Sequence, residues 1–141
     1  MRFMILVKAS KDSEAGVLPS RELVEAMGKF NEEMVKAGVM LSGEGLHATS
    51  KGARVKFSGA KRVVTDGPFP ETNQLFAGFW MIEVPSMAEA VDWASRIPFE
   101  EGEVEIRRVF ETSDFPADIL SPEAAAREQA LREELQRKAG R

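Results

Sequence analysis

The sequence predicts an α+β domain in which short helices pack on one face of a mainly antiparallel sheet. Two observations lead to this prediction. Strand-like and helix-like segments alternate in the order β-α-β, hairpin, β-α-β, and the helical segments begin at recognisable capping residues. The length of 141 residues suits one domain with a tail, and we place the domain at residues 1–112 and the tail at 113–141.

The first half of the domain predicts a strand, a connection and a helix. Residues 2–8 are almost continuously apolar, which is typical of a buried central strand, and 11–19 form a polar connection. Ser20 is a good N-cap for a helix that ends at Gly38. Its apolar residues recur at helical spacing: Leu23, Met27, Phe30 and Met34.

The middle of the chain predicts a second strand and a hairpin. Residues 39–46 indicate a strand that its glycines loosen. Charged and apolar residues alternate over 54–58, Gly59-Ala60 offers a tight turn, and 61–65 continue as the returning strand.

The last third repeats the pattern of a strand, a helix and a strand. Residues 76–84 form the most apolar stretch and are apolar on both faces. Ser86 and Glu89 have capping-box spacing before a helix that Pro98 ends, and 104–109 form the last strand. This order fits a ferredoxin-like βαβ-hairpin-βαβ sandwich, and a second subunit would most simply bury the other face of the sheet.

A charged helix is predicted in the tail. Ser121 is its N-cap and Pro122 its first residue, and four Glu–Arg or Glu–Lys pairs stand four residues apart in the favourable order. The apolar stripe is thin, so we expect a solvated helix on the body or on a partner subunit, with an interaction arm as the alternative.

Composition excludes several kinds of function. The chain has 19 Lys and Arg against 23 Asp and Glu, a formal net charge of −4, which disfavours a nucleic-acid binder. It has no cysteine, no tyrosine and one histidine, so thiolate chemistry and cysteine-ligated metals are excluded. We expect no metal and no cofactor. No apolar run is long enough to span a membrane, and we expect a cytoplasmic protein without membrane contact.

Residues with chemical potential gather between Gly43 and Gly78. His47 stands in a polar, glycine-punctuated run that ends at Arg54. Twelve residues later comes D-G-P-F-P-E-T, in which Asp66 and Glu71 flank a stiff turn with Phe69 at its tip.

This D-G-P-F-P-E-T segment resembles the signature of the YCII-related (DGPF) domain family. The similarity extends to K-G-A-R-V at 51–55, F-S-G at 57–59, G-F-W-M-I-E-V at 78–84, S-x-x-E-A-x-x-W-A at 86–94 and E-I-R-R-V-F at 105–110. It thus covers nearly all of residues 1–112. Several segments in the right order make the resemblance specific.

The resemblance implies a homodimer in which two ferredoxin-like units form an α/β barrel. Smaller relatives have a proposed His-Asp site in the cleft, suggested to act in acid/base chemistry, while the family as a whole lacks an assigned reaction. Similar domains occur beside or fused to extracytoplasmic-function sigma factors, which implies a sigma-factor association as one option. Asn73 departs from the pattern, because a lysine is common there.

We therefore predict His47 and Asp66 as a catalytic pair. His47 would act as a base near neutral pH, and Asp66 would orient it or take a proton itself. The alternatives are a loop histidine without a task and an aspartate that caps its own turn.

For ligand binding we predict Ser50, Arg54, Glu71 and Trp80. Arg54 offers a bidentate fork to an anion, or it is an ordinary strand-surface arginine. The alternative for Glu71 is that it bonds to backbone or pairs with a basic residue. Phe79 and Trp80 face opposite sides of one strand, and we assign Trp80 to the ligand site.

The leading hypothesis is a protein that binds an unidentified small polar or anionic molecule, with acid/base catalysis as its strongest form. The alternative is a non-catalytic module that senses a ligand and works with a sigma factor. In a third hypothesis the D-G-P-F turn is purely structural and fixes the dimer.

Overall fold

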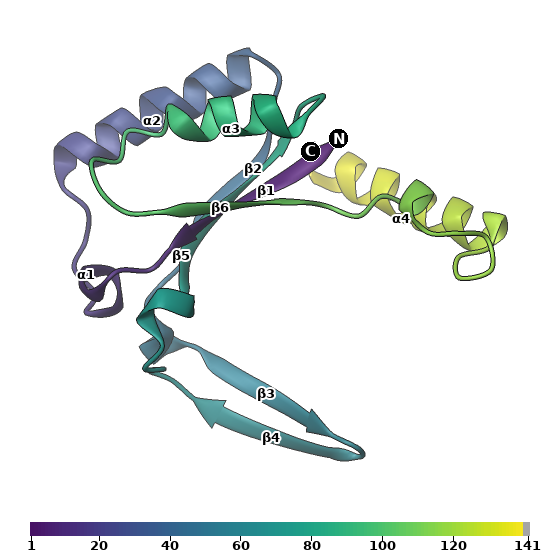
Figure 1. Ribbon diagram of the computed structural model, residues 1–141, viewed down its shortest axis with the longest axis horizontal. Helices are drawn as coiled ribbons and strands as arrows, with labels where there is room; N and C mark the ends of the chain where they lie inside the picture. Colours follow the sequence, from purple (N-terminus) through teal and green to yellow (C-terminus); the bar gives the residue numbers. More distant parts are fainter. Residues whose placement is uncertain (140–141) are drawn as a thin grey trace. The chain divides into compact units, whose positions relative to one another are not determined.

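A computed structural model describes residues 1–139 and shows mixed α and β elements along the chain (Figure 1). The strands are β1 (Arg2–Lys8), β2 (Met40–Gly45), β3 (Ala53–Ser58), β4 (Lys61–Asp66), β5 (Phe76–Glu83) and β6 (Val104–Arg108). The helices are α1 (Lys11–Glu14), α2 (Arg21–Lys36), α3 (Met87–Ser95) and α4 (Pro122–Ala139). Three short 3-10 turns complete them: η1 (Thr49–Lys51), η2 (Thr72–Gln74) and η3 (Thr112–Asp114).

The chain divides into two compact units, Met1–Arg108 and Val109–Arg141. In the first unit, four strands form a sheet in the order β2-β5-β1-β6, and every neighbouring pair is antiparallel. Strands β3 and β4 form a separate two-stranded sheet. The predicted α+β class with antiparallel strands is confirmed.

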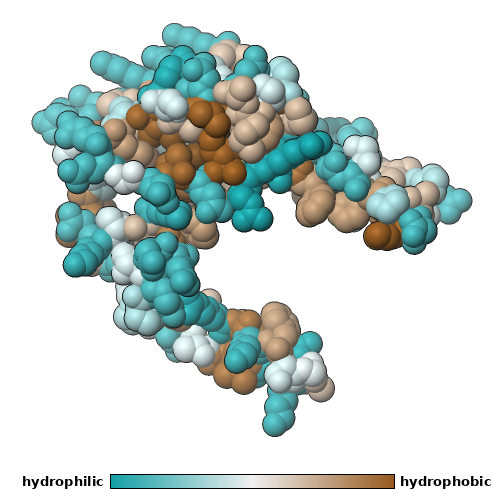
Figure 2. Space-filling view, in the orientation of Figure 1, coloured by the Kyte–Doolittle hydropathy of each residue, from teal (hydrophilic) through white to brown (hydrophobic). Residues whose placement is uncertain are grey.

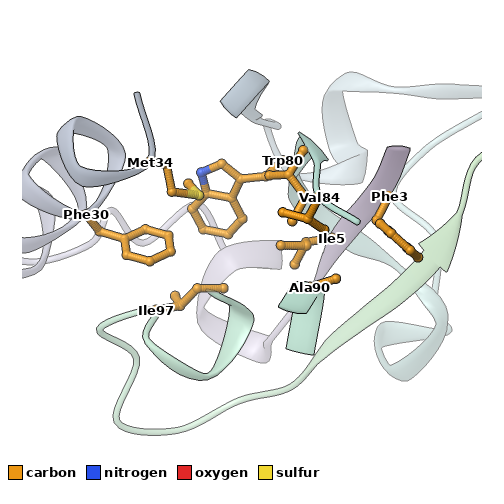
Figure 3. Packing of buried hydrophobic residues seen from close by; sticks show 9 residues of the cluster. Phe3, Ile5, Phe30, Met34, Trp80, Val84, Ala90 and Ile97 are labelled. Carbon is orange, nitrogen blue, oxygen red and sulfur yellow. The ribbon is translucent and has the colours of Figure 1, made fainter. Parts of the chain in front are cut away.

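The hydrophobic core lies between the four-stranded sheet and the helices α2 and α3, which cover one of its faces (Figure 1). The Trp80 ring lies beside Met34 and Phe30 in this layer (Figure 3). The Phe30 and Trp80 rings meet edge to face, with 5.8 Å between their centroids. The Trp80 indole N–H donates to the Oδ1 of Asn31 at 2.9 Å, so α2 satisfies the polar atom of the buried ring. The buried members of this core are Phe3, Ile5, Phe30, Met34, Trp80, Ile82, Val84, Ala90 and Ile97.

The opposite face of the sheet carries a second apolar set. Side chains alternate along a strand, so residues next to the buried Phe3, Ile5, Trp80 and Ile82 point to the other side. In the register Met4 pairs with Met81 and Leu6 with Phe79, and all four are half-buried. The helices α2 and α3 lie on the other side of the sheet and do not cover this face (Figure 1).

Local sequence signals place the main helices as predicted. Ser20 accepts a hydrogen bond from the N–H of Leu23 at 3.1 Å, and Ser86 accepts one from Glu89 at 3.2 Å. After α2, Gly38 has a φ of 74°, the left-handed conformation that glycine adopts without strain.

Residues 11–19 are not simply the polar connection that we predicted, because they begin with the one-turn helix α1. Ser10 and Ser13 cap this turn reciprocally: the Ser10 Oγ accepts from the Ser13 N–H at 3.0 Å, and the Ser13 Oγ accepts from the Ser10 N–H at 2.8 Å. A serine replaces the glutamate or glutamine that usually marks such a box, so the pattern is easily missed.

The second unit contains η3 and α4. The Ser121 Oγ accepts from the Ala124 N–H at 3.1 Å, which confirms the predicted N-cap. The rings of Phe110 and Phe115 lie 5.1 Å apart between their centroids. No helix within residues 1–139 is long and apolar enough to cross a membrane.

Candidate functional site

The D-G-P-F loop is packed backbone against backbone on the turn η1. The N–H of Gly67 donates to the carbonyl of Gly52 at 2.9 Å. A Cβ at position 67 would lie 1.7 Å from the carbonyl oxygen of Thr49, so no residue larger than glycine fits there without moving the backbone. The Gly67–Pro68 peptide bond is cis. The two segments therefore form one closely packed unit.

Thr49 links this loop to Glu14, the last residue of α1. Its hydroxyl donates to the Oε2 of Glu14 at 2.6 Å and accepts from the N–H of Phe69 at 3.0 Å. Its backbone N–H donates to the Oε1 of Glu14 at 3.0 Å. Both carboxylate oxygens of the half-buried Glu14 are thus occupied, and one threonine links α1 to the tip of the loop.

The sequence analysis did not identify the contact between Glu14 and Thr49. The two residues are 35 positions apart, so no local pattern connects them. Ser50, which we predicted as a ligand contact, is exposed and forms no side-chain hydrogen bond with another residue of 1–139.

Arg54 lies against the loop from strand β3. The centre of its guanidinium is 3.8 Å from the centroid of the Phe69 ring, and its Nη2 donates to the Oε2 of Glu71 at 3.1 Å. The Arg54 side chain remains 48% exposed. Of its five N–H donors, only one of the two on Nη2 has an acceptor within residues 1–139. Stacking and one hydrogen bond thus fix the guanidinium, and its other four donors have no acceptor within these residues.

The pairing changes the titration of Glu71. The hydrogen bond from Arg54 lowers the pKa of Glu71 below its ordinary value of 4.5, and a backbone hydrogen bond lowers it further. The carboxylate is therefore charged at neutral pH. Our alternative for Glu71, pairing with a basic residue, is the arrangement found.

His47 and Asp66 do not form a pair within the chain. His47 lies two residues after the end of β2 and is exposed, and Asp66 is exposed at the end of β4. No hydrogen bond or ion pair joins either side chain to another residue in the described part of the chain. The same region contains no cluster of three metal-ligating side chains.

Trp80 does not contact this loop region, because it lies in the hydrophobic core. Only 5% of the residue is exposed, and Asn31 on α2 holds its indole N–H. Successive side chains of a strand point to opposite faces of the sheet. Trp80 is therefore on the same face as the buried Ile82, while the neighbouring Phe79 points to the face away from α2 and α3.

Two surface hollows lie elsewhere. One of about 170 Å³ is near the end of α3, where Ile97, Phe99 and Val104 contribute to its wall. The other, of about 400 Å³, lies within the second unit beside Phe115 and Arg132. Neither is lined by a predicted site residue. Of those residues, only Arg54 and Glu71 are joined to each other on the surface.

Residues 1–113, which include all of β1 to β6, match the model of the YCII-related domain. The chain belongs to the YCII-related domain family. The resemblance that the D-G-P-F segment indicated is thereby confirmed.

Two individual proteins are similar to this family member. An uncharacterised protein of Rhizobium meliloti (strain 1021) is 33% identical over 85 residues, which are 60% of this chain, and the chain spans 64% of that protein's length. A 5-chloro-2-hydroxyhydroquinone dehydrochlorinase of Burkholderia phenoliruptrix AC1100, solved with 2,5-dihydroxybenzoquinone, matches 82% of this chain and all of its own at 13% identity. The TM-score of this match is 0.47.

Proposed function

We propose that this protein binds a small polar or anionic molecule at the surface formed by Arg54, Phe69 and Glu71. One observation carries the proposal. The Arg54 guanidinium is held flat on an aromatic ring and by one hydrogen bond, while its remaining donors have no acceptor within residues 1–139.

Arginine in this arrangement suits the recognition of a planar or tetrahedral anion. The guanidinium presents parallel N–H donors that match two oxygens of a carboxylate or phosphate, and stacking on an aromatic face fixes its plane. Glu71 adds a charged acceptor beside it, so a ligand carrying both an acidic oxygen and a donor group fits the site better than a simple anion. This follows because Glu71 would repel an additional negative charge placed close to it.

The protein is further proposed to act as a homodimer. A ferredoxin-like unit with an apolar sheet face needs a cover, and Met4, Leu6, Phe79 and Met81 form such a face on β1 and β5. A second copy whose sheet packs on this face would produce a dimeric α/β barrel, as the family resemblance implies.

Acid/base catalysis by His47 and Asp66 stays a prediction that adds to binding. The two side chains are exposed and not joined to each other in the single chain. Catalytic hydrogen bonds are often long or absent before substrate binds, so ligand binding must be established first. A ligand-sensing role with a sigma factor likewise stays a prediction from the resemblance, as does the cytoplasmic location.

Calorimetry on the full chain tests the binding proposal. A thermal-shift screen of small carboxylates, phosphates and amides first selects a ligand, whose affinity is then measured for wild type and Arg54→Lys. Arg54→Lys keeps the positive charge but removes the planar guanidinium and its paired N–H donors. This change should weaken binding roughly ten- to hundredfold, since a charged hydrogen bond contributes about 1.5–3 kcal/mol.

The matched control is Arg96→Lys, because Arg96 also stacks on an aromatic ring, at 3.6 Å from the centroid of Trp93. This control should leave the affinity within about twofold of wild type, well inside the spread expected for a remote surface change. Equal affinity of wild type and Arg54→Lys would contradict the proposal.

A further inference from the structure

The hairpin of β3 and β4 forms a sheet of its own. Its strands pair only with each other, and all twelve strand residues are exposed. In Figure 1 the hairpin stands clear of the four-stranded sheet of its unit. Hydrophobic side chains are nevertheless visible along it in Figure 2.

The strand register sorts these side chains onto two faces. Val55 is opposite Val64 and Phe57 is opposite Arg62, so these four share one face. Phe57 is 69% exposed and Val64 is 64% exposed. The guanidinium of Arg62 lies 4.6 Å from the centroid of the Phe57 ring. One face of the hairpin is therefore an apolar strip ending in a cationic group.

The other face is mainly polar. Lys56 is paired with Val63 and Ser58 with Lys61. An isolated two-stranded hairpin is at best marginally stable in water, and exposed contiguous apolar side chains mark interaction surfaces. The apolar strip thus requires a partner surface.

Charge indicates which partner. The segment 53–66 holds four of the chain's 19 basic residues and one of its 23 acidic residues, so it carries +3. The rest of the chain, with 15 basic and 22 acidic residues, carries −7. A basic arm on an acidic chain is complementary to a second copy of the same chain, and exchange of such arms satisfies two-fold symmetry.

We propose that the β3–β4 hairpin is a dimerisation arm whose apolar strip, Val55, Phe57 and Val64, packs on a second copy of this chain. This inference rests on the proposed homodimer and adds a second contact to its sheet interface. Arg54 belongs to the same strand as the strip, so the proposed ligand surface lies at the base of the arm, next to the subunit contact.

Sedimentation of the full chain over a dilution series tests the arm. The variant Phe57→Ser/Arg62→Glu removes an exposed ring and reverses one charge, and both positions are exposed, so folding should be retained and is checked by circular dichroism. We expect the dimer dissociation constant to rise at least tenfold. The matched control Val24→Thr/Lys29→Glu makes the same kinds of change at exposed positions of α2. This control should change the dimer dissociation constant less than twofold.

Crosslinking gives a second, direct readout. Because the chain has no cysteine, Ser58→Cys provides a single attachment point at the arm's tip for a photo-crosslinker. In a mixture of ¹⁴N- and ¹⁵N-labelled copies, crosslinks between copies should dominate, with acidic segments of the second copy as their targets.

Three outcomes would contradict the proposal that the hairpin is a dimerisation arm. A monomeric wild type contradicts both the arm and the homodimer. Unchanged dimerisation of Phe57→Ser/Arg62→Glu contradicts the arm alone. Binding of duplex DNA that this variant loses, with self-association unaffected, would assign the hairpin to nucleic acid. Failure of ligand binding with arm-dependent dimerisation intact would contradict the ligand proposal and support the arm.

Discussion

At the scale of single residues, Gly67 is the described glycine at which an added Cβ would lie closest to another atom. We predict that Gly67→Ala destabilises the fold by about 1–3 kcal/mol, because the added Cβ meets the Thr49 carbonyl oxygen at 1.7 Å and backbone cannot rotate away. Chemical denaturation measures the effect. Gly45→Ala is the control, since its Cβ would meet nothing within 4 Å. Equal stability of wild type and Gly67→Ala would show that the loop does not rest on η1.

The ion pair of Glu71 with Arg54 predicts that the stability of the folded protein depends on pH. Its pKa in the folded protein lies below the ordinary 4.5 because Arg54 donates to it. A lowered pKa means that the pair contributes to stability above pH 4.5, and that this contribution is lost as the pH falls through the folded-state pKa. A carboxyl ¹³C titration should show Glu71 ionising below 4.5, and Arg54→Gln should raise that pKa. No response of Glu71 to Arg54→Gln would mean that the ion pair does not form.

Sequence reasoning succeeded for residues whose neighbours are close in the chain or whose motif is specific. The pairing of Glu71 with a basic residue was one of the stated alternatives, and Arg54 is that residue. Sequence reasoning misplaced Trp80, because a strand that is apolar on both sides does not reveal which side the helices cover. It missed the interaction of Glu14 with Thr49, which depends entirely on tertiary folding.

At the scale of elements, the link between α1 and the D-G-P-F loop is a single hydroxyl. We predict that Thr49→Val costs about 1–3 kcal/mol, because it leaves the Phe69 N–H and one oxygen of Glu14 without their partner in a half-buried place. Amide exchange should show faster exchange at Phe69 in particular. Thr65→Val on the exposed strand β4 is the control. Unaltered protection of Phe69 in Thr49→Val would contradict the linking role.

Most elements follow from local chemistry. Serine caps, a glycine after the helix and the Gly-Ala hairpin turn each act within a few residues, so the boundaries of α2, α3 and the hairpin were predictable. The helix α1 was not, because its capping partners are two serines, a weaker signal. The 3-10 turn η1 also has no local signature and depends on Glu14 for its position.

At the scale of the whole molecule, the α+β class and the need to bury a second face of the sheet could be predicted, but the residues of that face could not. The register places Met4, Leu6, Phe79 and Met81 on the face that neither α2 nor α3 covers, which motivates the proposed homodimer. The hairpin supplies a second unpartnered surface of opposite charge to the rest of the chain. Both surfaces belong to the first unit, so the proposed assembly does not depend on α4.

The central claim is that a small molecule binds at Arg54, and a crystal structure of the full chain with the selected ligand tests it most directly. We expect a ligand oxygen within hydrogen-bond distance of the Arg54 guanidinium, with Phe69 still stacked beneath it and Glu71 beside the ligand. A ligand seated elsewhere, for instance in the hollow beside Phe99, with Arg54 bonded to Glu71 alone, would contradict it.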